Sequence, residues 1–278
     1  MRFEMSVGHR HLLPLLACWM MSAPAWAADT PAVTSPQPAA EWIVTLGVSA
    51  AVAPRYDGAS LYGPYALPSF SIRRSDEAAG FSAPDDGFDY TLLSGERWAI
   101  GPVLNLRGGR YLASDRRLYG LRDVPWTVEA GVFAEVWPIQ NRLRTRLEIR
   151  HGFRGRADGF VGDLSVDWVE KFGRFTLSGG PRMSFADADY MDANFGVLPT
   201  EAAANMRVRA FDPGPGVKSL GLAAALSYAW SDTWTTTAYA RYDRLVRDAA
   251  ASPIVRRFGS RDQFTIGTEL TFSFAVGR

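Results

Sequence analysis

The stretch RLRTRLEIR, residues 142–150, carries a charged side chain at every even position and none at the odd positions. The even positions are Arg142, Arg144, Arg146, Glu148 and Arg150, and the odd positions are Leu143, Thr145, Leu147 and Ile149. Because successive side chains point to opposite sides only in an extended strand, this pattern predicts a β-strand with one charged and one largely apolar face. The rest of the chain decides whether the apolar face meets a protein core or lipid.

The first residues predict export from the cytoplasm. The positively charged residues Arg2 and Arg10 precede an apolar run over residues 12–21. This run is too short to span a bilayer. Ala25-Trp26-Ala27 then supplies the small-x-small pattern of a secretory cleavage site. We therefore expect residues 1–27 to be a removed signal peptide.

The mature chain offers little reactive chemistry. The single cysteine, Cys18, lies inside the expected signal peptide, and lipidation of Cys18 is the alternative interpretation of this region. Residues 28–41 are rich in proline and alanine and are expected to form a flexible periplasmic leader. The formal net charge is only +1, so no strong field indicates a nucleic-acid partner.

From Trp42 onward, apolar side chains alternate with polar or small ones. In the last segment, for example, Ile266 and Phe272 alternate with Gly267 and Thr271. This period of two predicts antiparallel strands with one apolar face. Ten strands are expected over residues 42–52, 64–73, 97–107, 125–137, 142–151, 159–169, 174–185, 217–230, 234–245 and 263–276.

The connections between these strands fall into two kinds. Links such as PIQN, residues 138–141, are tight, whereas residues 108–124, 186–216 and 246–262 form long loops. Outer-membrane barrels have short periplasmic turns and long outer loops. The sequence therefore predicts an all-β, transmembrane, antiparallel up-and-down barrel over residues 42–278, in the outer membrane of a Gram-negative bacterium.

Tryptophan positions agree with this topology. Seven tryptophans beyond the signal peptide lie at strand ends: Trp42, Trp98, Trp126, Trp137, Trp168, Trp230 and Trp234. We expect all but Trp126 at the periplasmic rim, where amphipathic rings collect at a membrane interface.

The strand number depends on residues 74–94. This segment must hold an even number of further strands if both termini are periplasmic. Two short candidates, AAGFSA and FDYTLL, lie on either side of Asp85-Asp86-Gly87. We expect twelve strands, with ten as the alternative.

The charged face of residues 142–150 has to face the lumen, because an arginine on the lipid face at mid-depth costs about 2–4 kcal/mol. Acids on the neighbouring strands share this inward parity and can neutralise the arginines. The predicted network, a possible binding or selectivity site, comprises Glu129, Glu135, Arg142, Arg144, Arg146, Glu148, Arg150, Asp163 and Asp167. An ion-paired filling that holds the barrel together is favoured over a solute path.

The turn PIQN also predicts a register. If it is a four-residue hairpin loop, Glu135 lies opposite Arg144 and Glu129 lies opposite Arg150. Both would be inward pairs of opposite charge.

Several short motifs resemble the MipA/OmpV family, from about residue 42 to the end of the chain. They are Pro54-Arg55-Tyr56 with Gly58, Tyr65 with Pro68, DRRLYGLRDV at residues 115–124, Tyr190-Met191 with Phe195-Gly196-Val197, and Ala251-Ser252-Pro253. The resemblance implies an outer-membrane barrel that is a scaffold between a lytic murein transglycosylase and a penicillin-binding synthase. Other members of the family resemble porins or adhesins, so a narrow porin, an antibiotic-uptake channel and a surface adhesin are the alternatives.

No catalytic or metal site is expected. His151 ends the charged strand, but its odd parity directs it toward lipid rather than into a reactive cluster. The longest loop carries Asp187, Asp189 and Asp192. These acids lack the ordered spacing of a calcium loop, and the nearby Tyr190 and Phe195 are expected to fold the loop inward. We expect a protein without enzyme activity, cofactor or metal, whose surroundings are outer-membrane lipid.

Overall fold

A computed structural model describes residues 42–75, 80–153 and 159–277, so the expected signal peptide and leader lie outside the described residues. Twelve strands form one sheet. The strands are β1 (Trp42–Pro54), β2 (Tyr62–Arg74), β3 (Phe88–Asp89), β4 (Leu93–Gly95), β5 (Trp98–Arg107), β6 (Thr127–Ile139), β7 (Leu143–Gly152), β8 (Phe160–Phe172), β9 (Phe175–Ala186), β10 (Gly216–Ala229), β11 (Trp234–Leu245) and β12 (Asp262–Val276). The helices are η1 (Arg116–Leu118), α1 (Ala188–Phe195), α2 (Pro199–Asn205), α3 (Arg247–Ala251) and α4 (Pro253–Phe258). None of the helices described is long and apolar enough to cross a membrane.

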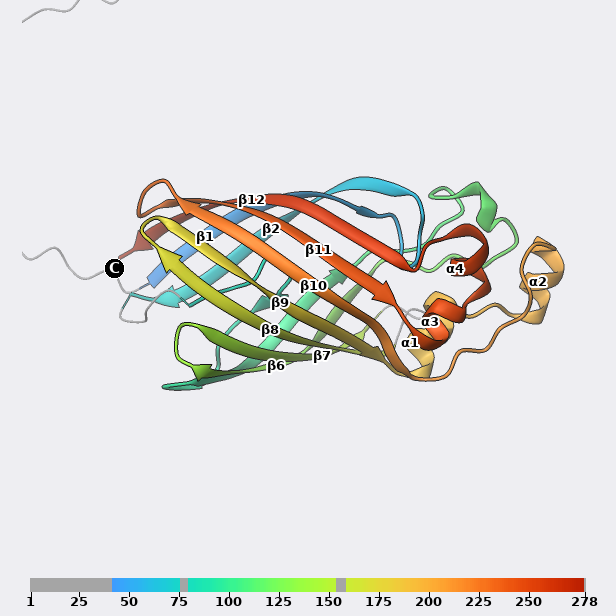
Figure 1. Ribbon diagram of the computed structural model, residues 1–278, viewed down its shortest axis with the longest axis horizontal. Coiled ribbons are helices and arrows are strands. Elements are labelled where there is room, and N and C mark those ends of the chain that lie inside the picture. Colours follow the sequence, from blue (N-terminus) through green and yellow to red (C-terminus); the bar gives the residue numbers. More distant parts are fainter. Residues whose placement is uncertain (1–41, 76–79, 154–158, 278) are drawn as a thin grey trace, which may run out of the picture. The chain divides into compact units, whose positions relative to one another are not determined.

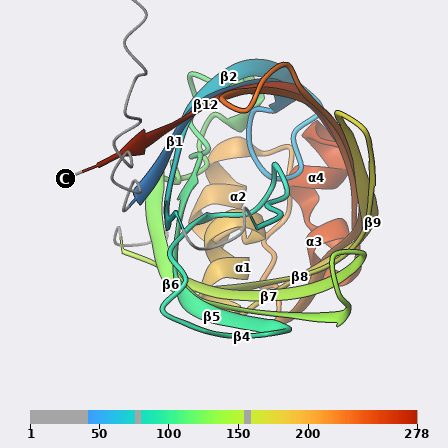
Figure 2. The same ribbon diagram turned by 90° about the vertical axis from the view of Figure 1, so that its left-hand side faces the viewer.

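The sheet is an antiparallel meander whose first and last strands lie side by side. Its order is β2-β1-β12-β11-β10-β9-β8-β7-β6-β5-β3, with β4 also paired to β5. Trp42 of β1 pairs with Val276 of β12, and Val52 pairs with Ile266. Figure 2 looks into the resulting ring. Residues of β3 contact β2, so the ends of the sheet approach each other and nearly complete the barrel. The predicted up-and-down barrel is confirmed.

The wall has an apolar outer face and a buried inner face. On β1, Val48 and Val52 are exposed on the outside, whereas Ala51 between them is buried. On β12, Ile266 is 64% exposed on the same outer surface. A continuous band of exposed apolar side chains on a sheet is stable against lipid, because every backbone group is paired within the wall.

The two ends of the barrel differ, as the connections predicted. The tight turns lie at one end, and the α-helices lie at the other (Figure 1). Trp98, Trp168, Trp230 and Trp234 are exposed near the tight-turn end, consistent with an interfacial aromatic belt. Trp137 packs instead against Phe81, with ring centroids 6.3 Å apart.

The long loops fold into a packed cap, whose apolar clusters also include residues at the ends of wall strands. One cluster comprises Val161, Ala186, Tyr190, Met191, Phe195, Leu245, Ala249, Ala250 and Val255. A second comprises Tyr56, Ala59, Leu118, Val197, Val208, Ile254 and Phe258. Tyr190 and Phe195 are both buried, which confirms that they fold the longest loop inward. The cap is therefore a structured part of the protein.

Residues 74–94 depart from the prediction of two separate short strands. FDYTLL supplies β3 and the first residue of β4, and both strands pair with β5, so they are pieces of one return limb. The described part of AAGFSA, residues 80–83, forms no strand. The reason is electrostatic, since Asp85 and Asp86 bond to arginines inside the barrel and hold this segment off the wall. We refer to residues 80–87 as the inward segment.

The predicted register of β6 and β7 is wrong by two residues. Glu135 lies opposite Arg146, and Glu129 lies opposite Gly152. The register shifts between Val136 and Ile139, and Asn141 adopts a left-handed φ of 60° in the turn. Because the displacement is two residues, every charge on β6 and β7 keeps its predicted side of the wall.

Candidate functional site

Arg144 lies at the centre of the charged lumen. Its side chain is fully buried and contacts three carboxylates, at 2.6 Å to Asp86, 2.7 Å to Asp167 and 3.7 Å to Glu135. The guanidinium also lies over the ring of Phe81, 4.7 Å from the centroid. A planar fork of five N–H donors suits such multiple carboxylate contacts better than the point charge of lysine would.

The network continues along β7 toward the cap. Arg146 approaches Asp89 at 2.5 Å and Glu148 at 2.8 Å. Arg150 pairs with Glu148 and, at 3.3 Å, with Glu129. Taking charges out of water is costly unless their partners are well placed, so these groups depend on one another.

The structure brings together in the lumen all the predicted network residues except Arg142. The assembled residues are Glu129, Glu135, Arg144, Arg146, Glu148, Arg150, Asp163 and Asp167. Arg142 instead lies in the β6–β7 turn, where its side chain is 57% exposed and 3.3 Å from Glu170. β7 begins only at Leu143, because the turn with left-handed Asn141 precedes it, so the first inward position of this strand is Arg144.

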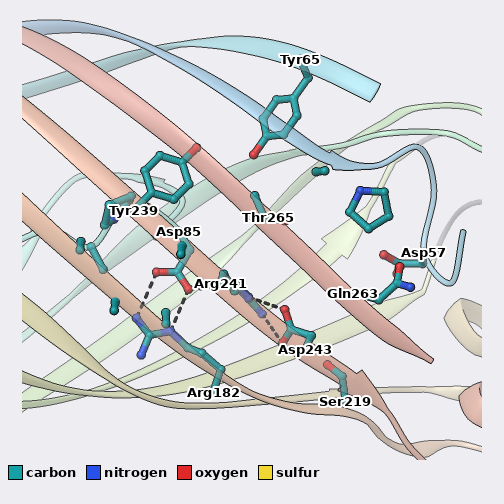
Figure 3. A pocket seen from close by; sticks show the side chains of 18 of the residues that line it. Asp57, Tyr65, Asp85, Arg182, Ser219, Tyr239, Arg241, Asp243, Gln263 and Thr265 are labelled. Atoms are coloured by element: carbon teal, nitrogen blue, oxygen red, sulfur yellow. Dashed lines mark hydrogen bonds and ion pairs between the residues drawn. The ribbon is translucent and has the colours of Figure 1, made fainter. Parts of the chain in front are cut away.

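The inward segment supplies carboxylates that the sequence pattern did not place in the lumen. Asp85 lies 2.8 Å from Arg182 of β9 and 3.0 Å from Arg241 of β11 (Figure 3). Asp86 accepts a hydrogen bond from the Ala83 backbone N–H at 2.8 Å while it binds Arg144. The inward parity of Arg182 and Arg241, which requires acids across the lumen, is the signal that could have indicated this arrangement.

The lumen retains open space beside the network. A cavity of about 340 Å³ is lined by Tyr65, Tyr239 and Arg241 together with small side chains such as Ala223 (Figure 3). A second cavity of about 240 Å³ also has Asp85 in its lining. Arg144 and Arg146 line neither cavity and are buried, so the lumen is filled around them, whereas the side with small residues leaves room for a small molecule.

Lys218, Asp57 and Tyr190 join the cap to the barrel wall. Lys218 Nζ is 3.2 Å from both Asp57 Oδ2 and Tyr190 Oη, and the tyrosine hydroxyl donates to Asp57 at 3.1 Å. Burial and the neighbouring Asp57 raise the pKa of Tyr190 to about 12. Although burial alone raises the pKa of Asp57, Lys218 and Arg107 bring it below its ordinary value. The cluster thus pairs a protonated phenol with a charged carboxylate, an arrangement suited to fastening the cap.

The other candidate groups have structural surroundings. His151 packs against Phe160, with ring centroids 4.6 Å apart. Asp187 caps α1 by accepting from the Tyr190 backbone N–H at 2.8 Å, and Asp192 pairs with Arg122 at 2.9 Å. Within the described residues, no group of three or more His, Cys, Asp or Glu side chains could hold a metal ion.

Sequence comparison links the chain to a known family. The family model for the MltA-interacting protein MipA matches residues 46–274. Outer membrane protein OmpV of Vibrio cholerae is 26% identical over 243 residues, which cover 84% of this chain and 87% of that protein. Together with the apolar outer band, these matches place the chain in the outer membrane.

Solved structures with related architecture include an outer membrane channel from Pseudomonas putida F1. It is 12% identical, with a TM-score of 0.38, over 89% of this chain and 100% of that chain. OmpT, an outer membrane protein of Vibrio cholerae, is 9% identical, with a TM-score of 0.35, over 88% of this chain and 100% of that chain.

Proposed function

The chain belongs to the MipA family of MltA-interacting proteins, and from this premise we propose that it acts by binding partner proteins rather than by catalysis or bulk transport. Its partners are a lytic murein transglycosylase and, in the same assembly, a penicillin-binding synthase. The barrel recruits these cell-wall enzymes to the inner face of the outer membrane.

The ion-paired network around Arg144 carries this proposal. Arg144 has no exposed surface and is bonded to acids from the inward segment and from two wall strands, β6 and β8. A solute on this side of the barrel would have to displace groups that are costly to leave unpaired. The arrangement supports a role in binding over one in bulk flow.

The tight turns are the described parts of the barrel that can reach a periplasmic partner. They and the adjoining strand ends present exposed charges: Arg142 and Asp232 lie in turns, and Lys171 lies near the end of β8. Exposed charges at the rim of an interface chiefly guide association and orientation. The apolar outer wall meets outer-membrane lipid and is not available to a soluble enzyme.

Co-purification tests the proposal. Tagged barrel in mild detergent should retain a lytic transglycosylase. Reversing two exposed charges at the tight-turn end with Arg142→Glu and Lys171→Glu should reduce that recovery at least fivefold, about 1 kcal/mol. The matched control reverses two exposed arginines of the cap, Arg256→Glu and Arg257→Glu, and should leave recovery unchanged. Failure of the wild-type barrel to retain the transglycosylase would remove the proposal's support.

A narrow uptake path is the second candidate, and the open volume of about 340 Å³ beside the network favours it. In that case the arginines of β7 would act as a selectivity ladder. Steady single-channel conductance that changes with Arg144→Ala or Arg146→Ala would favour this alternative.

A further inference from the structure

Asp85 is bound in the lumen in the way that a ligand carboxylate is bound. It arrives on the inward segment rather than on a wall strand. Its Oδ2 accepts from Arg182 Nε at 2.8 Å, and its Oδ1 accepts from Arg182 Nη2 at 3.1 Å. Arg241 Nη1 donates a further hydrogen bond to Oδ2 at 3.0 Å. Two parallel N–H···O bonds from one guanidinium are the geometry by which arginine recognises carboxylates.

The two arginines are held in place by other acids as well. Arg182 Nη2 donates to Asp167 at 2.7 Å. Arg241 Nε donates to Asp243 at 2.6 Å, and Figure 3 shows this pair on the same wall strand. Because each guanidinium keeps a second carboxylate, the site stays preorganised when Asp85 leaves it.

Free volume adjoins the bound carboxylate. The side chains of Asp85 and Arg241 are 17% and 25% exposed, and both line the cavity of about 340 Å³. The rings of Tyr65 and Tyr239 also line this space (Figure 3). Ala223 lines it too, and its small side chain leaves most of the space open. A molecule whose carboxylate lay between the arginines would have room there for a compact apolar or hydroxylated body.

We propose that Arg182 and Arg241 form a binding site for a small organic carboxylate, and that Asp85 is the tethered occupant of this site. The inference does not rest on the proposed recruitment of murein enzymes. A tethered group competes at an effective concentration in the millimolar range or above. Binding of a free acid to the wild-type protein is therefore weak, and removal of the Asp85 carboxylate strengthens it.

The test is calorimetric titration of the purified, folded barrel with sodium benzoate. The variant Asp85→Ala should bind benzoate at least tenfold more tightly than the wild type. Benzamide, a neutral molecule of nearly the same shape, should show no such gain. Adding Arg241→Ala to Asp85→Ala should abolish the gain, because one of the two guanidinium groups is then missing.

Asp163→Asn is the matched control. Asp163 is another lumen acid, paired with Arg150, and its loss leaves Asp85 between the two arginines. This variant should bind benzoate no better than the wild type. Folding is checked by heat-modifiable electrophoretic mobility, and Asp85→Asn, which keeps the side-chain length, replaces Asp85→Ala if the latter does not refold. Equal benzoate affinity in the folded wild type and the folded Asp85 variant would overturn the proposal, as would equal gains for benzoate and benzamide.

Discussion

Glu135 lies opposite Arg146 in the β6–β7 pair, and its carboxylate is 3.3 Å from Arg146 and 3.7 Å from Arg144 two positions earlier. A shift of two residues relative to the simplest hairpin therefore keeps the same charges in contact. A shift of one residue would turn them toward lipid. The lumen network thus fixes strictly which side of the wall each charged side chain faces. It fixes less strictly which residue lies opposite that side chain on the next strand.

Loss of Arg144 should destabilise the barrel strongly. Arg144→Ala leaves Asp86 and Asp167 buried without this guanidinium, and breaking a buried ion pair costs about 3–5 kcal/mol. Urea unfolding in detergent, followed by tryptophan fluorescence, measures the change in the free energy of unfolding. Arg142→Ala is the control, because its exposed pair with Glu170 contributes little. Equal destabilisation by the two variants would contradict a tightly coupled lumen network.

Labelling of intact cells tests the orientation. A cysteine introduced at Ala203, in α2 of the cap, should react with a membrane-impermeant maleimide. A cysteine at Asp232, in the tight turn between β10 and β11, should react only after the outer membrane is permeabilised. Both residues are exposed, so access to the side chain itself is matched. Labelling of the Asp232 position alone on intact cells would reverse the assigned topology.

The alternation of residues 142–150 predicted the strand, its inward charges and the class of fold, because side chains in a barrel wall face the lumen and the lipid in strict alternation. The inward segment could not be predicted in this way. Asp85-Asp86-Gly87 has the composition of a turn wherever it lies, and its place inside the lumen depends on Arg182 and Arg144, which are remote in sequence. The cap helices could not be predicted either. α3 and α4 are too short to show a local periodicity, and they are stabilised by packing within the cap.

The cluster that fastens the cap should respond to the loss of its ammonium group. Lys218→Met leaves the Asp57 carboxylate and the Tyr190 hydroxyl without that partner, and we expect faster proteolysis of the loop that carries α1. The loss of stability should be smaller than that caused by Arg144→Ala, because the Asp57 side chain is 39% exposed and water replaces part of the lost interaction. Lys171 is the other lysine of the chain and is exposed near the end of β8, so Lys171→Met is the control. Unchanged proteolysis of the Lys218 variant would show that the cluster does not hold the cap.

One part of the cap should loosen in acid. The Asp115 carboxylate accepts hydrogen bonds from Arg117 at 2.7 Å and from the Tyr56 hydroxyl at 3.2 Å. Although burial raises the pKa of Asp115, the bonds from Arg117 and Tyr56 hold it below its ordinary value. A lowered pKa means that the carboxylate stabilises the fold above the unfolded-state value of about 4, and that this contribution is lost as the pH falls further.

Hydrogen exchange at the Leu118 amide, which donates to the Asp115 carbonyl, reports this loosening. After correction for the intrinsic rate, exchange should be slow near pH 7 and faster at about pH 3. Asp115→Asn should exchange faster than the wild type already near neutral pH and depend less on pH. Protection of Leu118 that is the same at both pH values in the wild type would contradict the assigned role of Asp115.

Planar-bilayer recording of the purified wild-type barrel tests most directly whether the lumen is occupied. The barrel is added to the bilayer in lipid vesicles, and protein recovered from these vesicles is checked for folding by its heat-modifiable electrophoretic mobility. The inward segment crosses the lumen, because Asp86 pairs with Arg144 of β7 while Asp85 pairs with Arg182 of β9 and Arg241 of β11. The wild type should therefore show no steady single-channel conductance. The double variant Asp85→Ala and Asp86→Ala, which releases the inward segment from its arginines, should conduct. Steady conductance by the folded wild-type protein, unchanged in the double variant, would contradict this account.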